Sequence, residues 1–350
     1  MQHCHLAIVG GGPAGMMAAI AAAEAGARVT LLEQLSKPGL KLLATGGGHC
    51  NLTNTADTEA VMARFGRQGR FMAPALARLD GLALRAFFAA LGVATHAPDG
   101  FHVFPISNSA RHIQASLVRR MAALGVTLLV GTTGSALLLD NGRLVGLHTS
   151  RGPLEAAAVV LATGGRSYPT LGATGVGYRL AEQAGHRIVP PVPGLVPLVT
   201  AEPWVGDLAG VTLPDAEVWI GQPKLRRSRT RGPLLFTHRG LSGPAVLDLS
   251  AEVASLLAQQ PQVVVRVNLD PSKSHAAWAE RFGAWQRREG KRHVKTLLGE
   301  RLPRSLAAAV CRLAGGAQPP SAVCDLAGDV GGLRAAEVPS AQRRRLAELL

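Results

Sequence analysis

The 350-residue chain is poor in cysteine. Its cysteines are Cys4, Cys50, Cys311 and Cys324, and they are scattered along the sequence with no Cys-x-x-Cys pair. The sequence therefore indicates neither a zinc site nor a disulfide framework. We expect no bound metal and a reducing compartment.

Strong evidence for a membrane-spanning helix is also missing, although residues 6–23 carry no charge. Gly10 to Pro13 would interrupt a spanning helix in this run, no Lys or Arg precedes it, and a β-rich Val-Thr-Leu-Leu sequence follows it. These features exclude a membrane span and a targeting segment. We expect a soluble cytoplasmic protein.

Acidic residues are few relative to basic ones. Lys and Arg together number 37, Asp and Glu together number 23, and the formal net charge is +14 at pH 7. Residues 218–247 contain no acidic residue, and the basic residues that accumulate there are Lys224, Arg226, Arg227, Arg229, Arg231 and Arg239. Such a segment attracts RNA, a membrane surface or an anionic substrate.

Aromatic residues make up only 4% of the chain, and none is interleaved with these arginines as base-stacking platforms would require. We therefore interpret the basic segment as a solvated hairpin. We expect a small-molecule substrate, no nucleic-acid partner and no membrane partner. An RNA-binding or RNA-modifying protein is the alternative, and RNA retention that falls steeply with salt would identify it.

The most informative part of the sequence is its opening, LAIVGGGPAGMMAAIAAAEAGARVTLLE. Residues 6–9 are predicted to form an apolar strand and residues 13–25 an Ala-rich helix, which Gly26 ends. Residues 28–32 are predicted to form a second apolar strand. The opening is therefore expected to be a βαβ unit.

Three glycines at the first turn of this unit form the pattern Gly-x-Gly-x-x-Gly. Gly10 allows the tight turn, Gly12 lets the backbone approach a pyrophosphate, and Gly15 lets the helix pack closely against the strand. Free N–H groups at the positive end of the helix dipole then bind the pyrophosphate. Glu33 ends the second strand, where its carboxylate can accept both hydroxyls of an adenosine ribose. The opening predicts a bound dinucleotide.

Three later segments also have the composition of binding loops. Residues 37–54 contain three successive glycines flanked by hydrogen-bond donors, so their backbone can approach a flat ring or a phosphate. Residues 159–165 are an apolar strand that ends in Thr-Gly-Gly, and ligands of open α/β sheets bind beyond such strand ends. In residues 167–186, Gly172, Gly175 and Gly177 precede a predicted helix and make a second phosphate site conceivable.

The composition of the chain changes near residue 190. Strands are predicted before it at residues 126–130, 135–140, 144–149 and 156–161, and Asn141-Gly142 is a hairpin signal between the second and third of them. Four prolines then force an extended chain and mark a domain crossing: Pro190, Pro191, Pro193 and Pro197. Residues 217–220, 234–237 and 263–269 are strand-like, and helices are predicted at residues 276–285 and 294–298.

Taken together, these residues resemble the BaiN-like (YhiN-like) family of NAD(P)/FAD-dependent oxidoreductases, some of which are aminoacetone oxidase family FAD-binding enzymes. The resemblance covers nearly the whole chain. It depends on the opening GGGPAG with Glu33 and on KLLATGGGHCNLTN, VVLATGG, PTLGATGVGYRLAEQAGH and PVPGLVPLV. The most specific match is LLFTHRGLSGPAVLDLS at residues 234–250.

The resemblance implies FAD as the cofactor and assigns residues to its parts. Those on the pyrophosphate and the ribose are Gly10, Gly12, Pro13, Ala14, Gly15 and Glu33. Those along the isoalloxazine side are Lys41, Thr45, Gly46, Gly47 and Asn51. Gly134 matches a position whose backbone meets adenine, and Thr163 and Gly164 complete the adenosine side.

The implied fold is α/β: a Rossmann-like FAD-binding domain of the two-dinucleotide-binding-domain flavoprotein type with an inserted β-rich domain. We expect the FAD domain at residues 1–190, rejoined by about residues 321–350, and the inserted domain at residues 191–320. The implied activity is hydride or two-electron transfer between a small organic substrate and FAD. NAD(P)H or O₂ would be the other electron partner.

Two features depart from the family. His49 stands where family members usually have Arg, so a charged donor near the flavin becomes a titratable one. The chain also ends at Leu350, before the family's Gly-x-Tyr-Phe-Ala-Gly-Glu segment that closes over the flavin. The ending implies a fragment or a shortened gene product, and a non-catalytic FAD-binding remnant is a further alternative.

No catalytic acid or base is evident in the sequence. His49 and Cys50 lie in the flavin-side loop, but no base and orienting partner are visible as a pair. We therefore interpret both as structural or ring-contact residues. The sequence leaves the oligomeric state open.

Overall fold

The computed structural model describes residues 2–222, 229–315 and 329–350. The chain divides into two compact units, Met1–Val189 and Pro190–Leu350, and each is described here by itself. The boundary falls at the start of the proline-rich stretch. Lys224, Arg226, Arg227 and Cys324 lie outside the described residues.

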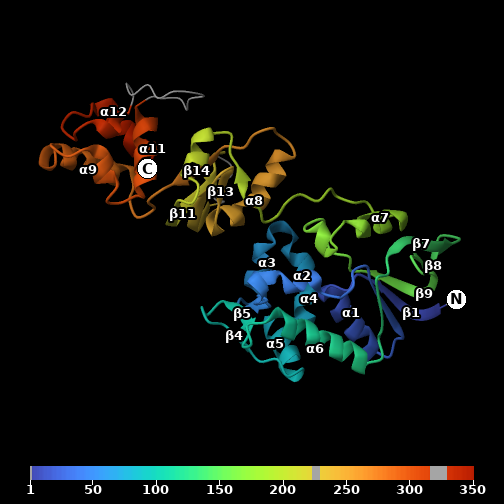
Figure 1. The fold of residues 1–350 in the computed structure, drawn as a ribbon. Helices are drawn as coiled ribbons and strands as arrows, with labels where there is room; N and C mark the ends of the chain where they lie inside the picture. Colours follow the sequence, from blue (N-terminus) through green and yellow to red (C-terminus); the bar gives the residue numbers. More distant parts are fainter. Residues whose placement is uncertain (1, 223–228, 316–328) are drawn as a thin grey trace. The chain divides into compact units, whose positions relative to one another are not determined.

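A six-stranded sheet with the order β6-β2-β1-β9-β8-β7 forms the centre of the first unit (Figure 1). Its strands are β1 (Gln2–Val9), β2 (Val29–Glu33), β6 (Thr127–Val130), β7 (Gly134–Asp140), β8 (Arg143–Thr149) and β9 (Gly152–Leu161). β6, β2, β1 and β9 are parallel neighbours, whereas β8 and β7 extend the sheet in antiparallel pairing. Asn141 and Gly142 both have positive φ between β7 and β8, which confirms the predicted hairpin.

The strand order explains where a ligand can bind. After β1 the chain adds β2 and β6 on one side, and only later places β9 on the other side of β1. The carboxyl end of β1 is therefore the topological switch point of the sheet, where connections leave in opposite directions and open a crevice.

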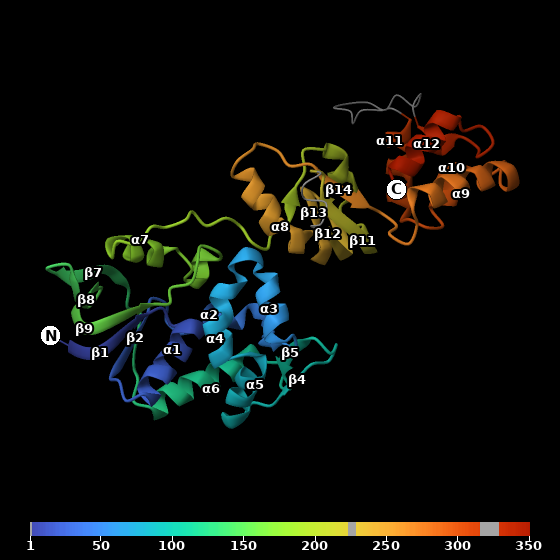
Figure 2. The same cartoon turned by 180° about the vertical axis from the view of Figure 1, so that it is seen from behind.

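Helices cover both faces of this sheet. α1 (Pro13–Glu24) and α6 (Ala110–Ala123) pack together on one face, and α7 (Val176–Gln183) contacts β7 and β9 on the other (Figure 2). Successive side chains of a strand point to opposite faces. Accordingly, Ile8 belongs to the hydrophobic cluster of α1 and α6, whereas Val9 belongs to the cluster that includes α7.

The chain between β2 and α6 forms short elements beside the main sheet. The helices are α2 (Leu40–Leu43), α3 (Thr58–Arg64), α4 (Ala73–Arg78) and α5 (Gly81–Ala90). β3 (Thr53–Asn54), β5 (His102–Pro105) and β4 (Thr95–His96) make a three-stranded sheet in that order. Residues 37–54, predicted as a loop, therefore contain a short helix, the 3₁₀ turn Thr45–Gly48 and the first strand of this sheet.

An antiparallel sheet with the order β10-β13-β12-β11-β14 opens the second unit. Its strands are β10 (Leu198–Val199), β11 (Thr212–Ile220), β12 (Arg229–Thr237), β13 (Gly240–Ser242) and β14 (Val265–Asn268). α8 (Pro244–Leu257) packs against β11 and β12. The α-helices in the described residues that follow are α9 (His275–Arg288), α10 (Val294–Leu298), α11 (Arg304–Ala314) and α12 (Ser340–Glu348).

The C-terminal residues belong to the second unit. The sequence predicts that residues 321–350 rejoin the first domain, but the described part, residues 329–350, packs in the core that also contains Leu297 of α10. Leu346 and Leu350 are buried in that core, and the backbone N–H of Leu269 donates to the Leu350 carbonyl at 3.1 Å. The prediction is therefore corrected for these residues, because their apolar side chains complete the helical core.

The glycine at position 15 provides a test of the close crossing between α1 and β1. A Cβ atom on Gly15 would lie 1.9 Å from the carbonyl oxygen of Gly10, and a backbone oxygen cannot swing away. Gly15→Ala is therefore expected to destabilise the first unit by roughly 1–3 kcal/mol. Urea unfolding followed by far-UV circular dichroism would measure the loss.

Two controls accompany this measurement. Gly165→Ala is the matched variant, since the nearest atom to its Cβ is the Tyr178 hydroxyl at an ordinary 3.6 Å. Tryptophan fluorescence reports the second unit, which holds all 4 tryptophans of the chain. Equal urea midpoints for Gly15→Ala and Gly165→Ala would contradict the close crossing.

Candidate functional site

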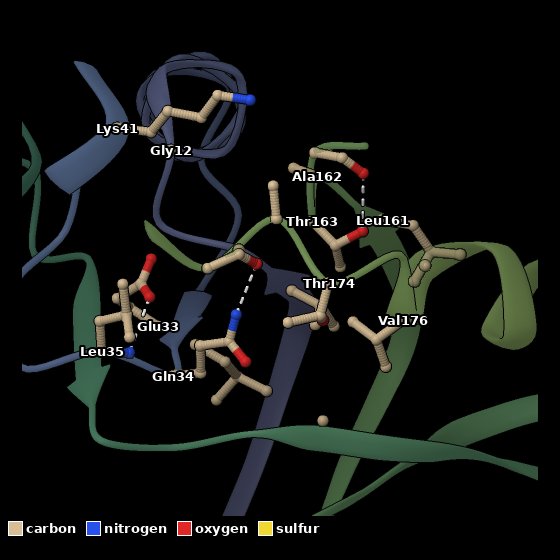
Figure 3. Close-up of a pocket in the computed structure, with 18 of the residues that line it drawn as sticks. Gly12, Glu33, Gln34, Leu35, Lys41, Leu161, Ala162, Thr163, Thr174 and Val176 are labelled. Carbon is tan, nitrogen blue, oxygen red and sulfur yellow. Dashed lines mark hydrogen bonds between the residues drawn. The ribbon is translucent and has the colours of Figure 1, made fainter. Parts of the chain in front are cut away.

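A cavity of about 900 Å³ lies at the carboxyl end of β1 in the first unit (Figure 3). Its walls come from the turn between β1 and α1, from residues 32–45, from residues 132–135 and from residues 161–181. Figure 3 shows Glu33, Gln34 and Lys41 on one side and Leu161, Thr163 and Val176 on the other. A cavity of this volume accommodates a cofactor-sized organic molecule.

The first turn presents backbone to this cavity. Gly10 has a φ of 110°, and a Cβ atom there would lie 2.4 Å from the Ala162 carbonyl oxygen. Gly12, the N-cap of α1, lines the cavity, and a Cβ atom added to it meets no protein atom within 4 Å. The first N–H groups of a helix have no partners within the helix. The turn therefore offers backbone donors and open space to a ligand.

Glu33 is fixed beside this turn. The residue is only 8% exposed, yet it lines the cavity. The Gly11 N–H donates to Oε2 at 2.9 Å, and the Leu35 N–H donates to Oε1 at 2.8 Å. A carboxylate has about four acceptor sites, so each oxygen retains a lone pair for a ligand hydroxyl. The backbone thus orients Glu33 for hydrogen bonding to a bound molecule.

The position of the Glu33 carboxylate also requires glycine at residue 11, the second of the three successive glycines in the opening. A Cβ atom on Gly11 would lie 2.8 Å from Oε2 of Glu33 and 2.9 Å from its Cβ. The Gly-x-Gly-x-x-Gly pattern gives no role to this position, so sequence reasoning missed it. The run of three glycines was the available signal.

Two contacts link the opposite walls of the cavity. The Gln34 side-chain amide donates to the Gly172 carbonyl at 2.6 Å. Lys41 Nζ donates to the Ser167 hydroxyl at 2.7 Å and to its carbonyl at 3.2 Å. These bonds tie the segment after β2 to the segment between β9 and α7.

The glycine-rich segment before α7 belongs to this same cavity. Gly172 and Gly177 are among its lining residues, and a Cβ atom on Gly177 would lie 2.1 Å from the Thr163 hydroxyl oxygen. The start of α7 therefore packs directly on the Thr163-Gly164 turn. The segment in which the sequence makes a second phosphate site conceivable therefore lines the same cavity as the first turn.

Most of the predicted site residues line the cavity. They are Gly10, Gly12, Pro13, Ala14, Glu33, Lys41, Thr45, Gly134, Thr163 and Gly164. Four others are not in its lining: Gly15, Gly46, Gly47 and Asn51. Gly15 lies behind the first turn. Gly46 and Gly47 have positive φ in the 3₁₀ turn, and a Cβ atom on Gly46 would lie 3.2 Å from the Asn51 backbone nitrogen.

Sequence reasoning missed several lining residues, among them Gln34, Thr132, Thr133, Ser135, Tyr178 and Arg179. The two threonines follow the predicted strand of residues 126–130 after a single glycine, so their position near a strand end was an available signal. Gln34 follows Glu33 in the same way. For Tyr178 and Arg179 no signal existed, because the contacts of α7 depend on tertiary packing.

His49 and Cys50 do not line the cavity. Nδ1 of His49 lies 3.1 Å from the Asn108 carbonyl oxygen, which is a structural contact. Cys50 is 1% exposed, and burial raises the pKa of its thiol. A reactive cysteine requires a lowered pKa and access, so Cys50 does not have the character of a nucleophile.

Residues 2–222, 229–315 and 329–350 hold no candidate metal cluster, membrane-spanning helix or disulfide. Within these ranges no group of three or more His, Cys, Asp or Glu side chains is arranged to hold a metal ion. None of the helices there has both the length and the apolar character needed to cross a membrane. Cys4, Cys50 and Cys311 are free thiols.

The described part of the basic segment is a hairpin with paired charges. Arg229 Nη1 lies 2.8 Å from a Glu217 carboxylate oxygen, and the Arg229 guanidinium lies 4.6 Å from the centre of the Trp219 ring. Arg231 Nη2 lies 2.7 Å from Asp215 Oδ2, and this hydrogen bond lowers the pKa of Asp215. Acids on β11 therefore neutralise these arginines on β12.

Comparison with known proteins identifies the family of this chain and several relatives. The family model described as "HI0933-like protein Rossmann domain" matches residues 4–344. This match confirms the predicted family resemblance and the Rossmann-like fold. "Ribosomal RNA dihydrouridine synthase" of Escherichia coli (strain K12) is 35% identical over 77% of this chain. "3-dehydro-bile acid delta(4,6)-reductase" of Clostridium scindens is 34% identical over 76% of it.

The chain spans 65% and 64% of the lengths of these two relatives, respectively. Among solved structures, 3-ketosteroid-delta4-(5alpha)-dehydrogenase from Rhodococcus jostii RHA1 is similar, with a TM-score of 0.44 and 19% identity. That similarity covers 60% of this chain and 59% of the other.

Glu33 should stabilise the first unit even without a ligand. Glu33→Ala removes the acceptors of the Gly11 and Leu35 N–H groups, and an unsatisfied buried donor costs about 1–3 kcal/mol. Urea unfolding of ligand-stripped protein, followed by far-UV circular dichroism, would measure this loss. Glu182→Ala, on the exposed surface of α7, is the control. If both variants unfold at the same urea concentration, the backbone does not depend on the Glu33 carboxylate.

Proposed function

The chain belongs to the HI0933-like Rossmann-domain family, and we propose that it is an FAD-dependent oxidoreductase. The observation that supports this proposal is the pairing of an open glycine turn at Gly12 with the fixed Glu33 carboxylate in one cavity. A dinucleotide has a pyrophosphate and a ribose that match these two groups. FAD, when bound, supplies two-electron transfer to or from an organic substrate.

The residues of the chain hold and orient the cofactor in this proposal. The N–H groups at the start of α1 bind the pyrophosphate, and Glu33 accepts the ribose hydroxyls. Gly134, Thr163 and Gly164 would hold the adenosine side of FAD. Lys41 and Thr45 would hold the isoalloxazine side, with Gly46, Gly47 and Asn51 in the loop beyond.

The names of the relatives suggest the reaction class. Dihydrouridine is uridine with its ring carbon–carbon double bond reduced, and a delta(4,6)-reductase is named for the double bonds on which it acts. We propose that this chain catalyses the two-electron reduction of a conjugated carbon–carbon double bond, with NAD(P)H as the electron donor. We further propose a cytoplasmic location, because free thiols suit a reducing compartment.

Two substrate classes are candidates for this reaction. A small organic molecule is the first, since the bile acid reductase is similar over 76% of this chain. A nucleobase of RNA is the second. It is favoured by the net charge of +14 and by the name of the Escherichia coli relative.

The absorption spectrum of the purified protein tests the proposed function. We expect a flavin spectrum, an adenine-bearing flavin released by heat, and bleaching of the yellow colour by NADH or NADPH without oxygen. Release of FMN or of no flavin would overturn the cofactor assignment. Bound FAD that no donor reduces would support the alternative of a non-catalytic remnant.

Gly12→Val tests the position of the pyrophosphate. The branched side chain would enter space that no protein atom occupies, so the fold should persist while FAD binding weakens at least a hundredfold, or about 3 kcal/mol. Equilibrium dialysis of FAD would measure binding, and circular dichroism would report the fold. Gly194→Val, in the second unit and equally free of neighbours, is the control. Normal FAD stoichiometry in Gly12→Val would refute this placement.

A further inference from the structure

A second cavity, of about 500 Å³, lies in the second unit, between the end of α9 and residues 334–337. Its lining is dominated by basic side chains: Arg287, Arg288, Lys291, Arg292 and Arg334. Two acidic residues, Glu289 and Glu337, also line it. We call this cavity the basic cleft.

Most of the positive charge in the basic cleft is unpaired. Arg292 is held by Glu289 at 3.5 Å and by Glu300. Glu337 accepts the backbone N–H of Arg334 at 2.9 Å, and Arg334 is an exposed residue. Within the described residues, no carboxylate oxygen lies within 4.0 Å of the charged nitrogens of four cleft residues: Arg287, Arg288, Lys291 and Arg334. This contrasts with the ion-paired arginines of the β11–β12 hairpin.

The lining excludes two common kinds of ligand. Sites for small organic molecules are mostly apolar, but the uncharged residues of the basic cleft are only Gly290 and Ala336. Amphipathic helices that insert into a membrane surface add large apolar side chains to their cations. Between residue 265 and the C-terminus, the described residues expose no large hydrophobic side chain. Neither the body of an organic ligand nor a lipid layer would find apolar contacts here.

The remaining chemistry is recognition of phosphate. Guanidinium groups bind phosphate oxygens through paired, fork-like hydrogen bonds, and the basic cleft contains four arginines and one lysine. No aromatic side chain lines the cleft, so it lacks a platform on which bases could stack. Contacts of this kind position a nucleic acid by its backbone without reading its sequence.

We propose that the basic cleft binds phosphate groups of an RNA backbone. This inference rests on the RNA candidate of the proposed function, and it assigns the contact to the basic cleft rather than to Arg229 and Arg231 of the β11–β12 hairpin. Glu289 and Glu337 also line the cleft, but within the described residues neither Arg288 nor Arg334 forms an ion pair like those of Arg229 and Arg231. Binding phosphate at unpaired cations also releases counterions from the RNA, which favours association at low salt.

The test compares two variants of the full chain that lose the same charge. Arg288→Gln with Arg334→Gln removes two unpaired cations of the basic cleft, and Arg229→Gln with Arg231→Gln removes two paired ones. Binding of a fluorescently labelled, single-stranded RNA of mixed sequence is measured by anisotropy across a KCl series. For two lost phosphate contacts, we expect affinity on the order of tenfold weaker and a salt slope smaller by about 1.4. The hairpin variant should stay within about twofold of the parent chain.

A second cleft pair, Arg287→Gln with Lys291→Gln, should behave like the first, and circular dichroism checks that each exposed substitution leaves the fold intact. Equal losses in the cleft and hairpin variants would overturn the proposal, because net charge alone would then explain binding. So would an absence of RNA binding by the parent chain. Cleft-dependent binding of tripolyphosphate alone, or of phosphatidylglycerol vesicles alone, would show that RNA is the wrong ligand.

The flavin content of each variant separates this proposal from the proposed function. RNA binding that depends on the cleft in a protein without FAD would overturn the oxidoreductase proposal and leave the cleft assignment intact. Full FAD content and reduction by NAD(P)H, with no effect of the cleft variants on RNA binding, would overturn only the cleft assignment.

Discussion

At Gly10, Gly11 and Gly15 the turn between β1 and α1 has no room for a side chain, and the arrangement of the first unit depends on this constraint. A Cβ atom at Gly10 would collide with the backbone that follows β9, and one at Gly15 would collide with the carbonyl of Gly10. At Gly11 it would collide with the side chain that ends β2. The turn is therefore the point at which β1, its two neighbouring strands and α1 come into direct contact. Close packing of this kind tolerates almost no added volume.

The same constraint produces the cavity. Because the backbone of the first turn approaches Glu33 so closely, the Gly11 N–H can bind the carboxylate and turn it toward the ligand space. On the opposite side of β1, Thr163 is held against the start of α7 through Gly177. Gln34 then connects the two sides through the Gly172 carbonyl. Segments far apart in the sequence thus form one site because they pack around the same turn. Few of the residues that line this site are charged.

The elements that depend mainly on neighbouring residues in the sequence could be predicted from the sequence alone. The βαβ opening, the Asn141-Gly142 hairpin and the apolar strand before Thr163 are all present where they were predicted. Glu33 was identified as a site residue because it is an acidic residue at the end of a buried strand. The placement of residues 329–350 could not be predicted in this way. The apolar side chains of α12 suit any helical core, and only tertiary packing selects the core of α9 and α11.

The distribution of charge separates what the two units can bind. In the first unit, an anion would meet backbone N–H groups at the start of α1, with Lys41 and Arg179 as the cationic side chains of the cavity. Backbone donors are fixed in place and add no net charge, so the large positive charge of the chain is not needed there. In the second unit, β11 neutralises the arginines of β12, whereas the cations at the end of α9 face solvent. Net charge alone therefore predicts little about binding. The carboxylates beside each cation determine which part of a basic surface remains available to a polyanion.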